Sequence, residues 1–166
     1  MGSREELIIF EIKRNPGIRF RELMKIIGVK NGIMSYYTRK LETTGDIRIE
    51  RTPRVSRFYS SDLSEEESKL VKRLRQETPK RILISLVENN TLTFQEIVQN
   101  VRKAPSTTSF YLKQLVSDNI ILTSRSNLKT LYYVSEKKRI ANLIEEYHPD
   151  IIEQASDNLS DIIESL

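Results

Sequence analysis

The stretch IMSYYTRKL, residues 33–41, occurs twice in this chain in related form. The second copy is TTSFYLKQL at residues 107–115, which lies 74 residues further along. Both copies predict a helix with one apolar face and one face of small, hydroxyl, aromatic and basic side chains. A helix of this kind is suited to insertion into a polar, negatively charged surface.

The same offset relates the two halves of the chain well beyond these helices. An ungapped register of about fifty residues indicates a duplicated domain rather than a solenoid repeat. We therefore expect a first domain at 1–62, a helical linker at 63–78, a second domain at 79–134 and a C-terminal helical tail at 135–166. Identical residues fall on one another at Ile8 and Ile82, Asn15 and Asn89, Phe20 and Phe94, Glu22 and Glu96, Ile47 and Ile121, Arg51 and Arg125, and Tyr59 and Tyr133.

The composition limits the classes of protein that this chain can belong to. Of its 166 residues 38% are hydrophobic, enough for two small cores supported by a linker helix or an oligomer. There is no cysteine and one histidine, His148, which excludes disulfides, thiol chemistry and cysteine-ligated zinc or iron–sulfur sites. We expect no cofactor. Without a secretory signal or a membrane-length apolar run, a soluble cytoplasmic protein is expected.

The charge is distributed unevenly along the chain. Residues 1–62 carry 13 basic and 8 acidic side chains, and residues 63–134 carry 11 and 7, so their net charges are +5 and +4. Residues 135–166 carry 3 and 8, a net charge of −5. A polyanion would meet the two repeats and the acidic tail would face away from it. Chance asymmetry of a solvated surface is the alternative.

Local signals predict three helices in the first copy. Ser3 and Glu6 form the capping-box pattern that begins a helix, which ends at 15–17, Asn-Pro-Gly. A second helix is expected at 20–27, and Gly28 suits the turn into the third helix. Helix, turn, helix is the order of a DNA-reading unit.

Two strand-like segments follow the third helix. Residues 47–51 and 55–59 flank Thr52-Pro53-Arg54, which predicts a hairpin, or wing, with basic residues near its tip. Ser64 and Glu67 form another capping box, which predicts a helical spacer. Thr78-Pro79 is expected to cap a helix that starts at Lys80.

The stretch from Gly32 to Asp46, followed by a basic hairpin, resembles winged helix-turn-helix domains of the ArsR and MarR type. Ser35, Tyr37, Arg39, Leu41 and Gly45 match the recognition-helix pattern of those families, and Ser109, Tyr111, Lys113 and Leu115 match it in the second copy. Asn119 replaces the glycine there, although asparagine tolerates the left-handed backbone. The resemblance implies a mainly α fold with small β-hairpins (α+β): two tandem winged helix-turn-helix domains plus C-terminal helices. The layout without cysteine ligands resembles archaeal-type regulators.

A helix fits the major groove of B-DNA, where its N-terminal half meets base edges and later side chains meet phosphates. The groove candidates are Asn31, Gly32, Ser35, Tyr36 and Arg39 in the first copy and Ser106, Thr107, Ser109, Phe110 and Lys113 in the second. Gln114 is a further candidate for a DNA contact. Candidates for phosphate or minor-groove contacts are Lys30, Lys40, Lys103, Arg51, Arg54, Arg57, Arg125 and Lys129. Arg39 is the leading candidate.

Packing is the competing interpretation for several of these side chains. Tyr37 and Tyr111 each precede an inward-facing leucine by four residues, which favours packing over base contacts. A wing arginine is as easily solvated as bound to DNA. The second copy offers Lys113 and Gln114 where the first has Arg39 and Lys40, and its wing has fewer basic residues. It is therefore the weaker DNA reader by composition, and dimerisation or a protein contact is its alternative role.

The tail predicts a dimerisation segment. Apolar residues at helical spacing with acidic flanks suit packing against the same segment of a second subunit. Packing back onto its own domain is the alternative. The dimerisation candidates are Ile144, Tyr147, Ile152, Ala155, Leu159, Ile162 and Leu166.

These features predict a transcriptional regulator that binds promoter DNA sequence-specifically, with two recognition helices per chain. The protein is expected to be a homodimer. Contacts to the transcription machinery are a further possibility. The chain lacks a glycine-rich phosphate loop, a nucleophile–histidine arrangement and a metal-type carboxylate cluster, so no enzyme is expected. The alternative is a winged-helix protein–protein interaction module of a transcription assembly. RNA binding is less favoured because no aromatic platform is evident.

Overall fold

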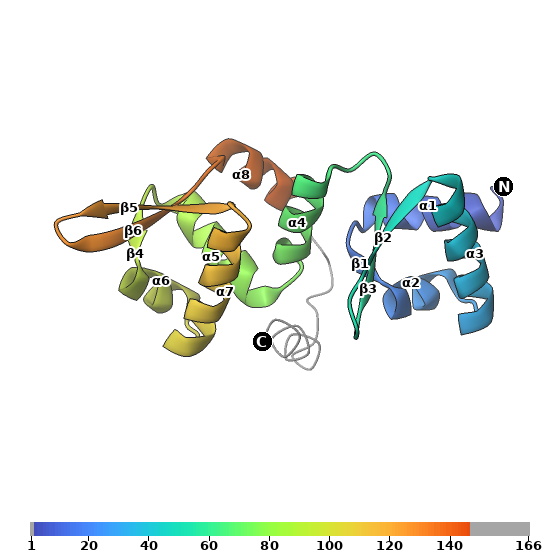
Figure 1. Cartoon of the computed structure of the whole chain (residues 1–166), viewed down its shortest axis with the longest axis horizontal. Coiled ribbons are helices and arrows are strands. Elements are labelled where there is room, and N and C mark those ends of the chain that lie inside the picture. The colour runs from blue at the N-terminus through green and yellow to red at the C-terminus, as the bar shows by residue number, and fades with distance from the viewer. Residues whose placement is uncertain (1, 147–166) are drawn as a thin grey trace. The chain divides into compact units, whose positions relative to one another are not determined.

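A computed structural model describes residues 2–146, which form eight helices and two small antiparallel sheets (Figure 1). The described residues divide into two compact units, and the division falls between Val71 and Lys72, inside helix α4 (Glu65–Leu74). The Ser64 hydroxyl accepts a hydrogen bond of 3.1 Å from the Glu67 N–H at the start of α4. The predicted helical spacer is therefore present.

The first unit begins with a capped helix. The Ser3 hydroxyl accepts from the Glu6 N–H at 3.2 Å and the Glu6 carboxylate accepts from the Ser3 N–H at 3.1 Å, which is the predicted capping box. Gly28 and Gly45 end the next two helices with φ of +75° and +83°, a conformation that favours glycine. The elements are α1 (Arg4–Arg14), β1 (Ile18–Arg19), α2 (Phe20–Ile27), α3 (Asn31–Thr44), β2 (Ile47–Arg51) and β3 (Ser56–Ser60).

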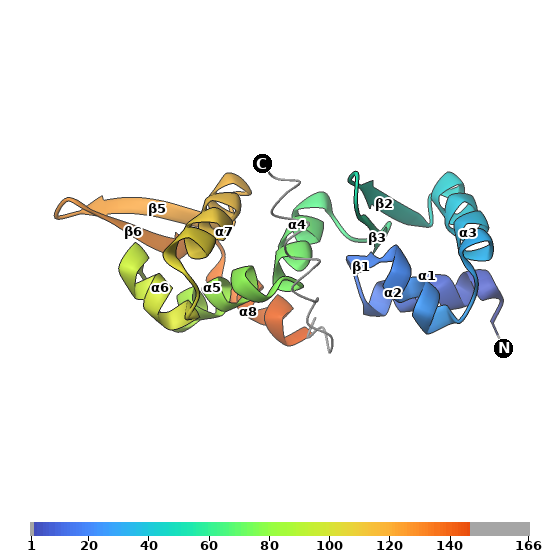
Figure 2. The same ribbon diagram turned by 90° about the horizontal axis from the view of Figure 1, so that it is seen from below.

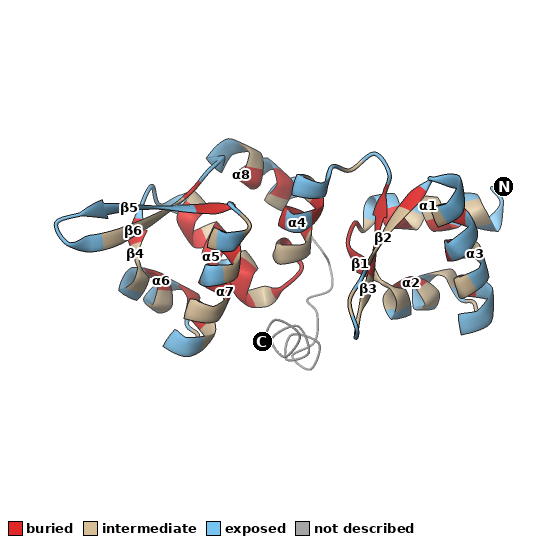
Figure 3. Ribbon diagram, in the orientation of Figure 1, coloured by how far each residue is buried: buried red, intermediate tan, exposed pale blue. Residues whose placement is uncertain are grey.

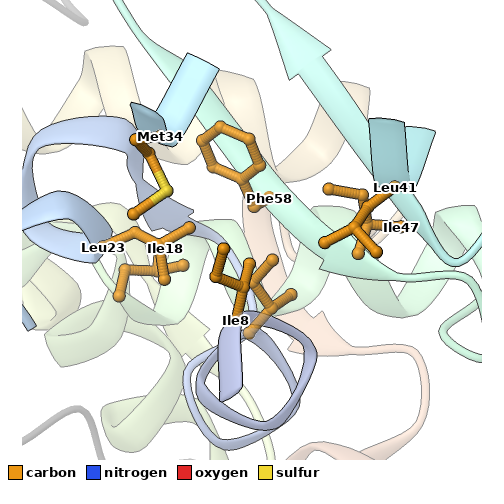
Figure 4. Packing of buried hydrophobic residues seen from close by; sticks show 8 residues of the cluster. Ile8, Ile18, Leu23, Met34, Leu41, Ile47 and Phe58 are labelled. Carbon is orange, nitrogen blue, oxygen red and sulfur yellow. The ribbon is translucent and has the colours of Figure 1, made fainter. Parts of the chain in front are cut away.

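The sheet of the first unit has the strand order β1-β3-β2 and supplies one wall of the core. Ile49 of β2 and Ile18 of β1 both pair with Phe58 of the central strand. Figure 4 shows side chains from the three helices and the sheet turned toward one another around Phe58. The fully enclosed residues of this core are Ile8, Ile12, Ile18, Leu23, Met34, Leu41, Ile47 and Phe58.

The second unit repeats this order of elements. Thr93 and Glu96 form a capping box, and Pro105 occupies the first turn of the third helix. Asn119 has a φ of +59°, so it adopts the left-handed conformation that Gly45 has in the first unit. The elements are α5 (Glu77–Glu88), β4 (Leu92–Thr93), α6 (Phe94–Val101), α7 (Pro105–Ser117), β5 (Ile121–Ser126), β6 (Lys129–Val134) and α8 (Lys137–Glu146).

The sheet of the second unit has the order β4-β6-β5, and its hairpin is longer than that of the first. Ile121 and Val134 pair at the buried base of the hairpin, and Ser126 pairs with Lys129 at its tip. Beyond Ile121, every residue of β5 is exposed. Within this unit the hairpin projects past α6 and α7 (Figures 1 and 2).

One helix start differs from the prediction. The helix α5 begins at Glu77 with Gln76 as its cap, so Thr78 and Pro79 lie inside the first turn instead of preceding it. Proline is tolerated there because the N–H groups of the first turn have no partner within the helix. The short strands β1 and β4 were not predicted.

The first helix of the tail, α8, packs against α5 of its own unit. Ile140 and Leu143 are buried in this packing and Ile144 is half-buried. The fold-back alternative therefore holds for this helix. The other dimerisation candidates lie outside the described residues: Tyr147, Ile152, Ala155, Leu159, Ile162 and Leu166. Within residues 2–146, no helix combines the length and apolar character needed to cross a membrane.

Candidate nucleic-acid interface

The helix α3 has one buried face and one outward face, which places the predicted residues. Met34, Thr38 and Leu41 are buried, because helical spacing brings them to one side. The Thr38 hydroxyl donates to the Met34 carbonyl at 2.9 Å, so this polar group is satisfied within the core. The opposite stripe, called here the α3 face, consists of Gly32, Ser35, Tyr36, Arg39 and Thr43.

The α3 face is a shallow depression of about 450 Å³. Tyr36 is 63% exposed and its ring meets Tyr37 edge-on, with centroids 5.2 Å apart. Tyr37 is half-buried against the core, which agrees with its expected packing role. The Ser35 hydroxyl donates to Asn31 Oδ1 at 3.1 Å, so two predicted groove residues are already linked.

The side chains of Arg39 and Lys40 are both exposed, but they differ in their partners within the chain. Lys40 Nζ lies 2.5 Å from Glu5 Oε1 on α1, and this hydrogen bond raises the pKa of Lys40. The Arg39 carbonyl accepts a hydrogen bond from the Thr43 hydroxyl at 2.9 Å, but the Arg39 side chain makes no hydrogen bond or ion pair with any residue in 2–146. Its guanidinium is therefore available to a ligand without breaking an internal contact.

The structure corrects the assignment of Arg57 to DNA. This residue is 2% exposed and Arg57 Nη1 donates to the Gly17 carbonyl at 3.1 Å. It lies on the central strand β3, so its side chain is on the opposite face of the sheet from its core neighbour Phe58, and it is buried there as well. Arg57 therefore has a structural role.

Two further arginines of this wing have protein partners. Arg48 donates to the Leu63 carbonyl at 3.0 Å and to the Ser68 hydroxyl, and its guanidinium stacks on Tyr59. Arg51, at the end of β2, forms an ion pair with Glu42. Arg54, at the tip, is exposed and has no partner among the described residues, so it is the available cation of the β2–β3 wing.

A pocket of about 300 Å³ lies between the start of α2 and the tip of the wing. Arg54 and Arg21 both line it, and Arg21 is exposed. Arg21 could not be identified from the sequence, because a basic residue in the first turn of a short helix carries no signal of its own. Its position beside Arg54 adds a second cation to this side of the unit.

The helix α7 repeats the pattern of α3 at the 74-residue offset. Thr108, Tyr111, Leu112 and Leu115 are buried. Phe110 meets Tyr111 edge-on at 5.1 Å, which is the same arrangement as Tyr36 and Tyr37. The outward stripe, called here the α7 face, consists of Ser106, Ser109, Phe110, Lys113 and Ser117, and Thr107 beside it is half-buried. Lys113 is exposed and unpaired within the described chain.

Gln114 was predicted as a DNA contact, and the structure corrects this assignment. Gln114 Oε1 accepts a hydrogen bond of 2.8 Å from Arg73 Nη1, and Arg73 Nε donates to Asp118 Oδ2 at 2.8 Å. Arg73 belongs to α4, so Gln114 lies on the side of α7 that is occupied by protein. Lys103 is also paired, because its Nζ lies 3.5 Å from Glu77 Oε2.

The wing of the second unit has exposed cations, of which Lys129 interacts electrostatically with Glu96 of α6. Arg125 and Lys129 are both exposed near the tip, and residues 121–134 contain no carboxylate. The Arg125 side chain has no hydrogen bond or ion pair with residues 2–146. In the first wing, by contrast, the side chains of Arg48, Arg51 and Arg57 have protein partners and that of Arg54 does not.

Residues 75–121 match a family model described as winged helix-turn-helix DNA-binding. The match spans α5, β4, α6 and α7 and reaches the first residue of β5. The chain therefore contains a winged helix-turn-helix DNA-binding domain. A comparison with curated proteins gave no match.

Several solved structures are similar to about half of this chain. HlyU from Vibrio cholerae is 25% identical, covers 49% of this chain and 91% of its own, and has a TM-score of 0.43. NolR from Sinorhizobium fredii is 21% identical, with 51% and 85% covered and a TM-score of 0.44. A MarR family transcriptional regulator from Silicibacter pomeroyi is 26% identical, with 54% and 64% covered and a TM-score of 0.37.

Proposed function

We propose that this chain is a transcriptional regulator that binds double-stranded promoter DNA sequence-specifically, with α3 and α7 as recognition helices of two tandem winged helix-turn-helix domains. The family match covers the second of these domains. The proposal for the first rests on the repeated element order, the 74-residue register and the equivalent outward faces of α3 and α7.

The observation that carries the proposal is the unpaired Arg39 on the α3 face. Arg39 is exposed and lies in a stripe with Gly32, Ser35 and Tyr36. This stripe contains no acidic residue that could pair with the Arg39 side chain. Arginine makes two parallel hydrogen bonds to guanine O6 and N7 in the major groove. The hydroxyl groups of Ser35 and Thr43 and the ring of Tyr36 lie on the same face and supply further contacts to base edges and thymine methyl groups.

Different residues serve different parts of the DNA in this proposal. The N-terminal halves of α3 and α7 meet base edges, and Lys30, Arg54, Arg125 and Lys129 meet phosphates or the minor groove. Lys40, Arg51 and Lys103 reach DNA by exchanging a carboxylate partner for a phosphate. Such an exchange keeps each cation paired, so it adds less affinity than a free cation would.

We propose the domain limits 1–62 and 79–134, with the second extended to Glu77 to include all of α5. The tail, 135–166, is proposed as the homodimer segment through its residues beyond α8, because Ile140 and Leu143 of α8 are already buried within the unit. A dimer would present four recognition helices, and promoter half-sites would then repeat with the symmetry of the protein.

The test uses the full chain and a duplex selected by it from a random-sequence pool. Arg39→Glu should weaken binding to the selected duplex by roughly ten- to a hundredfold, since a bidentate base contact contributes about 1–3 kcal/mol. Lys138→Glu is the matched control, because it makes the same charge change at an exposed position outside both faces. Circular dichroism checks that both variants fold.

Two outcomes contradict the proposal. Equal binding by Arg39→Glu and Lys138→Glu would mean that the α3 face does not read DNA. A parent chain that selects no duplex, and whose weak binding shows no dependence on salt, would instead favour a protein–protein interaction module.

A further inference from the structure

The tip of the β5–β6 hairpin carries an apolar side chain in a backbone conformation that disfavours it. Asn127 and Leu128 form the two-residue loop, with φ of +49° and +65°. Two positive φ values define the type I′ turn, in which asparagine and glycine are preferred and leucine is strained. Leu128 is 92% exposed, so no packing contact within its unit offsets the strain. The fold itself gives no reason for a leucine at this position.

The flanking residues place one cation on each face of the hairpin. Ser126 pairs with Lys129, and Arg125 pairs with Thr130. Successive side chains of a strand point to opposite faces, so Lys129 lies on the face of Ser126 and Arg125 lies on the other. Both cations are exposed. The tip is therefore an apolar point with positive charge on both sides.

The β5–β6 hairpin is long and narrow enough to bring the Leu128 side chain to a ligand. Its six-residue strands extend about 20 Å at the usual rise per residue. Figure 3 shows its outer half exposed, and in Figures 1 and 2 it projects past α6 and α7. The minor groove of B-DNA is about 6 Å wide, which excludes a helix but admits a narrow tip between two phosphate walls.

We propose that Leu128 enters the DNA minor groove as an apolar wedge, with Arg125 and Lys129 meeting the phosphates of the two opposite strands. The inference rests on the proposed function and names a contact within it. Apolar side chains inserted between base steps partly unstack them and bend the duplex. The wedge therefore favours flexible pyrimidine–purine steps, and it reads deformability rather than hydrogen-bonding groups.

The first wing does not carry such a tip. Its loop is Thr52-Pro53-Arg54-Val55, in which Pro53 and the cation Arg54 are exposed and Thr52 and Val55 are half-buried. Contact with a phosphate or with the narrow groove of an adenine tract suits an arginine, whereas bending suits an apolar side chain. The two units would then act differently on the same duplex.

The decisive variant is Leu128→Gly, because Asn-Gly is the preferred sequence for a type I′ turn and the hairpin should become more stable. Leu128→Met keeps an unbranched apolar side chain at the tip. Leu7→Ala is the control, since it removes an exposed leucine from α1, outside the proposed interface. The probe is the duplex that the full chain selects from a random pool, with fluorescent dyes at its two ends.

Affinity is measured by anisotropy and bending by energy transfer between the dyes. Leu128→Gly should weaken binding about tenfold and reduce the bend, as expected for the loss of one buried leucine side chain. Leu128→Met should stay within about twofold of the parent, and Leu7→Ala should match it. If Leu128→Gly binds and bends the duplex as the parent does, the wedge is wrong and the proposed function stands. If the parent binds no duplex, both fall.

Discussion

Arg51 donates two parallel hydrogen bonds to Glu42, with Nη1 and Nη2 each 2.7 Å from a carboxylate oxygen. Glu42 belongs to α3 and Arg51 ends β2, so this ion pair links α3 to the β2–β3 hairpin. The hydrogen bond lowers the pKa of Glu42 and raises that of Arg51. This contact between α3 and the β2–β3 hairpin is therefore strongest when Glu42 is ionised.

The first prediction concerns the pH dependence of this pair. Because the pKa of Glu42 is depressed in the folded chain, the pair stabilises the fold fully above the ordinary value of 4.5. Its contribution is lost as the pH falls through the lowered pKa. The two side chains are 53% and 35% exposed, so the contribution stays below about 1 kcal/mol.

Urea unfolding of the parent and of Glu42→Gln, followed over a range of pH, measures this contribution. The parent should be slightly more stable at pH 7, and the difference should disappear well below pH 4.5. Glu88→Gln, which changes an exposed carboxylate on α5, provides the control and should show no such convergence. A difference that is constant with pH would show that Glu42 is not held by Arg51 in solution.

The second prediction compares one backbone position in the two units. Gly28 and Arg102 are related by the 74-residue offset, and both end a helix with positive φ, +75° and +59°. An arginine is strained in this conformation and a glycine is not. Arg102→Gly should therefore raise the unfolding free energy of its unit by about 1 kcal/mol.

The opposite change in the first unit is the matched test. A Cβ built at Gly28 meets nothing within 4 Å, so Gly28→Ala introduces strain without a steric clash. It should lower stability by about 1 kcal/mol. Opposite signs for the two variants, measured by urea unfolding, are the expected result. A destabilised Arg102→Gly would mean that the arginine side chain contributes more than its backbone costs.

Much of the fold could be predicted from local sequence. The capping residues Ser3 and Thr93, the turn at Gly28 and the left-handed Asn119 follow from interactions within a few residues, and the structure has each of them. The two-residue strand β1 could not be predicted, because two residues cannot show an alternating pattern. Pairing with the distant strand β3 defines it.

The sequence could not predict which basic side chains are paired or buried in the folded chain. Arg57 and its acceptor Gly17 are 40 residues apart, and Gln114 is 41 residues from Arg73. No local pattern distinguishes Arg57, which is buried, from Arg54, which is free. Counting basic residues therefore does not tell which of them are occupied within the chain, whereas the tertiary contacts do.

The third prediction follows from the buried position of Arg57. Arg57→Met keeps a long side chain at this buried position but removes the donor to the Gly17 carbonyl, which should destabilise the first unit by about 1–3 kcal/mol. Under conditions where the variant remains folded, its affinity for the selected duplex should equal that of the parent. Chemical unfolding and anisotropy titration measure the two effects. Weaker DNA binding by the folded variant would restore Arg57 as a DNA contact.

The fourth prediction separates free from paired cations by salt dependence. A lysine or arginine that neutralises one phosphate contributes about 0.9 to the slope of log K against log salt concentration. Arg54 has no partner to lose, so Arg54→Ala should reduce the slope by about this amount.

Arg51 already has a counter-ion in Glu42, so removing the Arg51 side chain should change the salt slope less than removing a cation without a partner. When Arg51 binds a phosphate, Glu42 is released near the DNA and opposes the gain. Arg51→Ala should therefore lower the slope by clearly less than Arg54→Ala, while Lys138→Ala, a control on α8, should leave it unchanged. Titrations of the selected duplex at four or more salt concentrations give the slopes. Equal slopes for the Arg51 and Arg54 variants would show that the Arg51–Glu42 pair opens without opposing DNA binding. Pairing in the free chain would then not decide which wing cations contribute to DNA affinity.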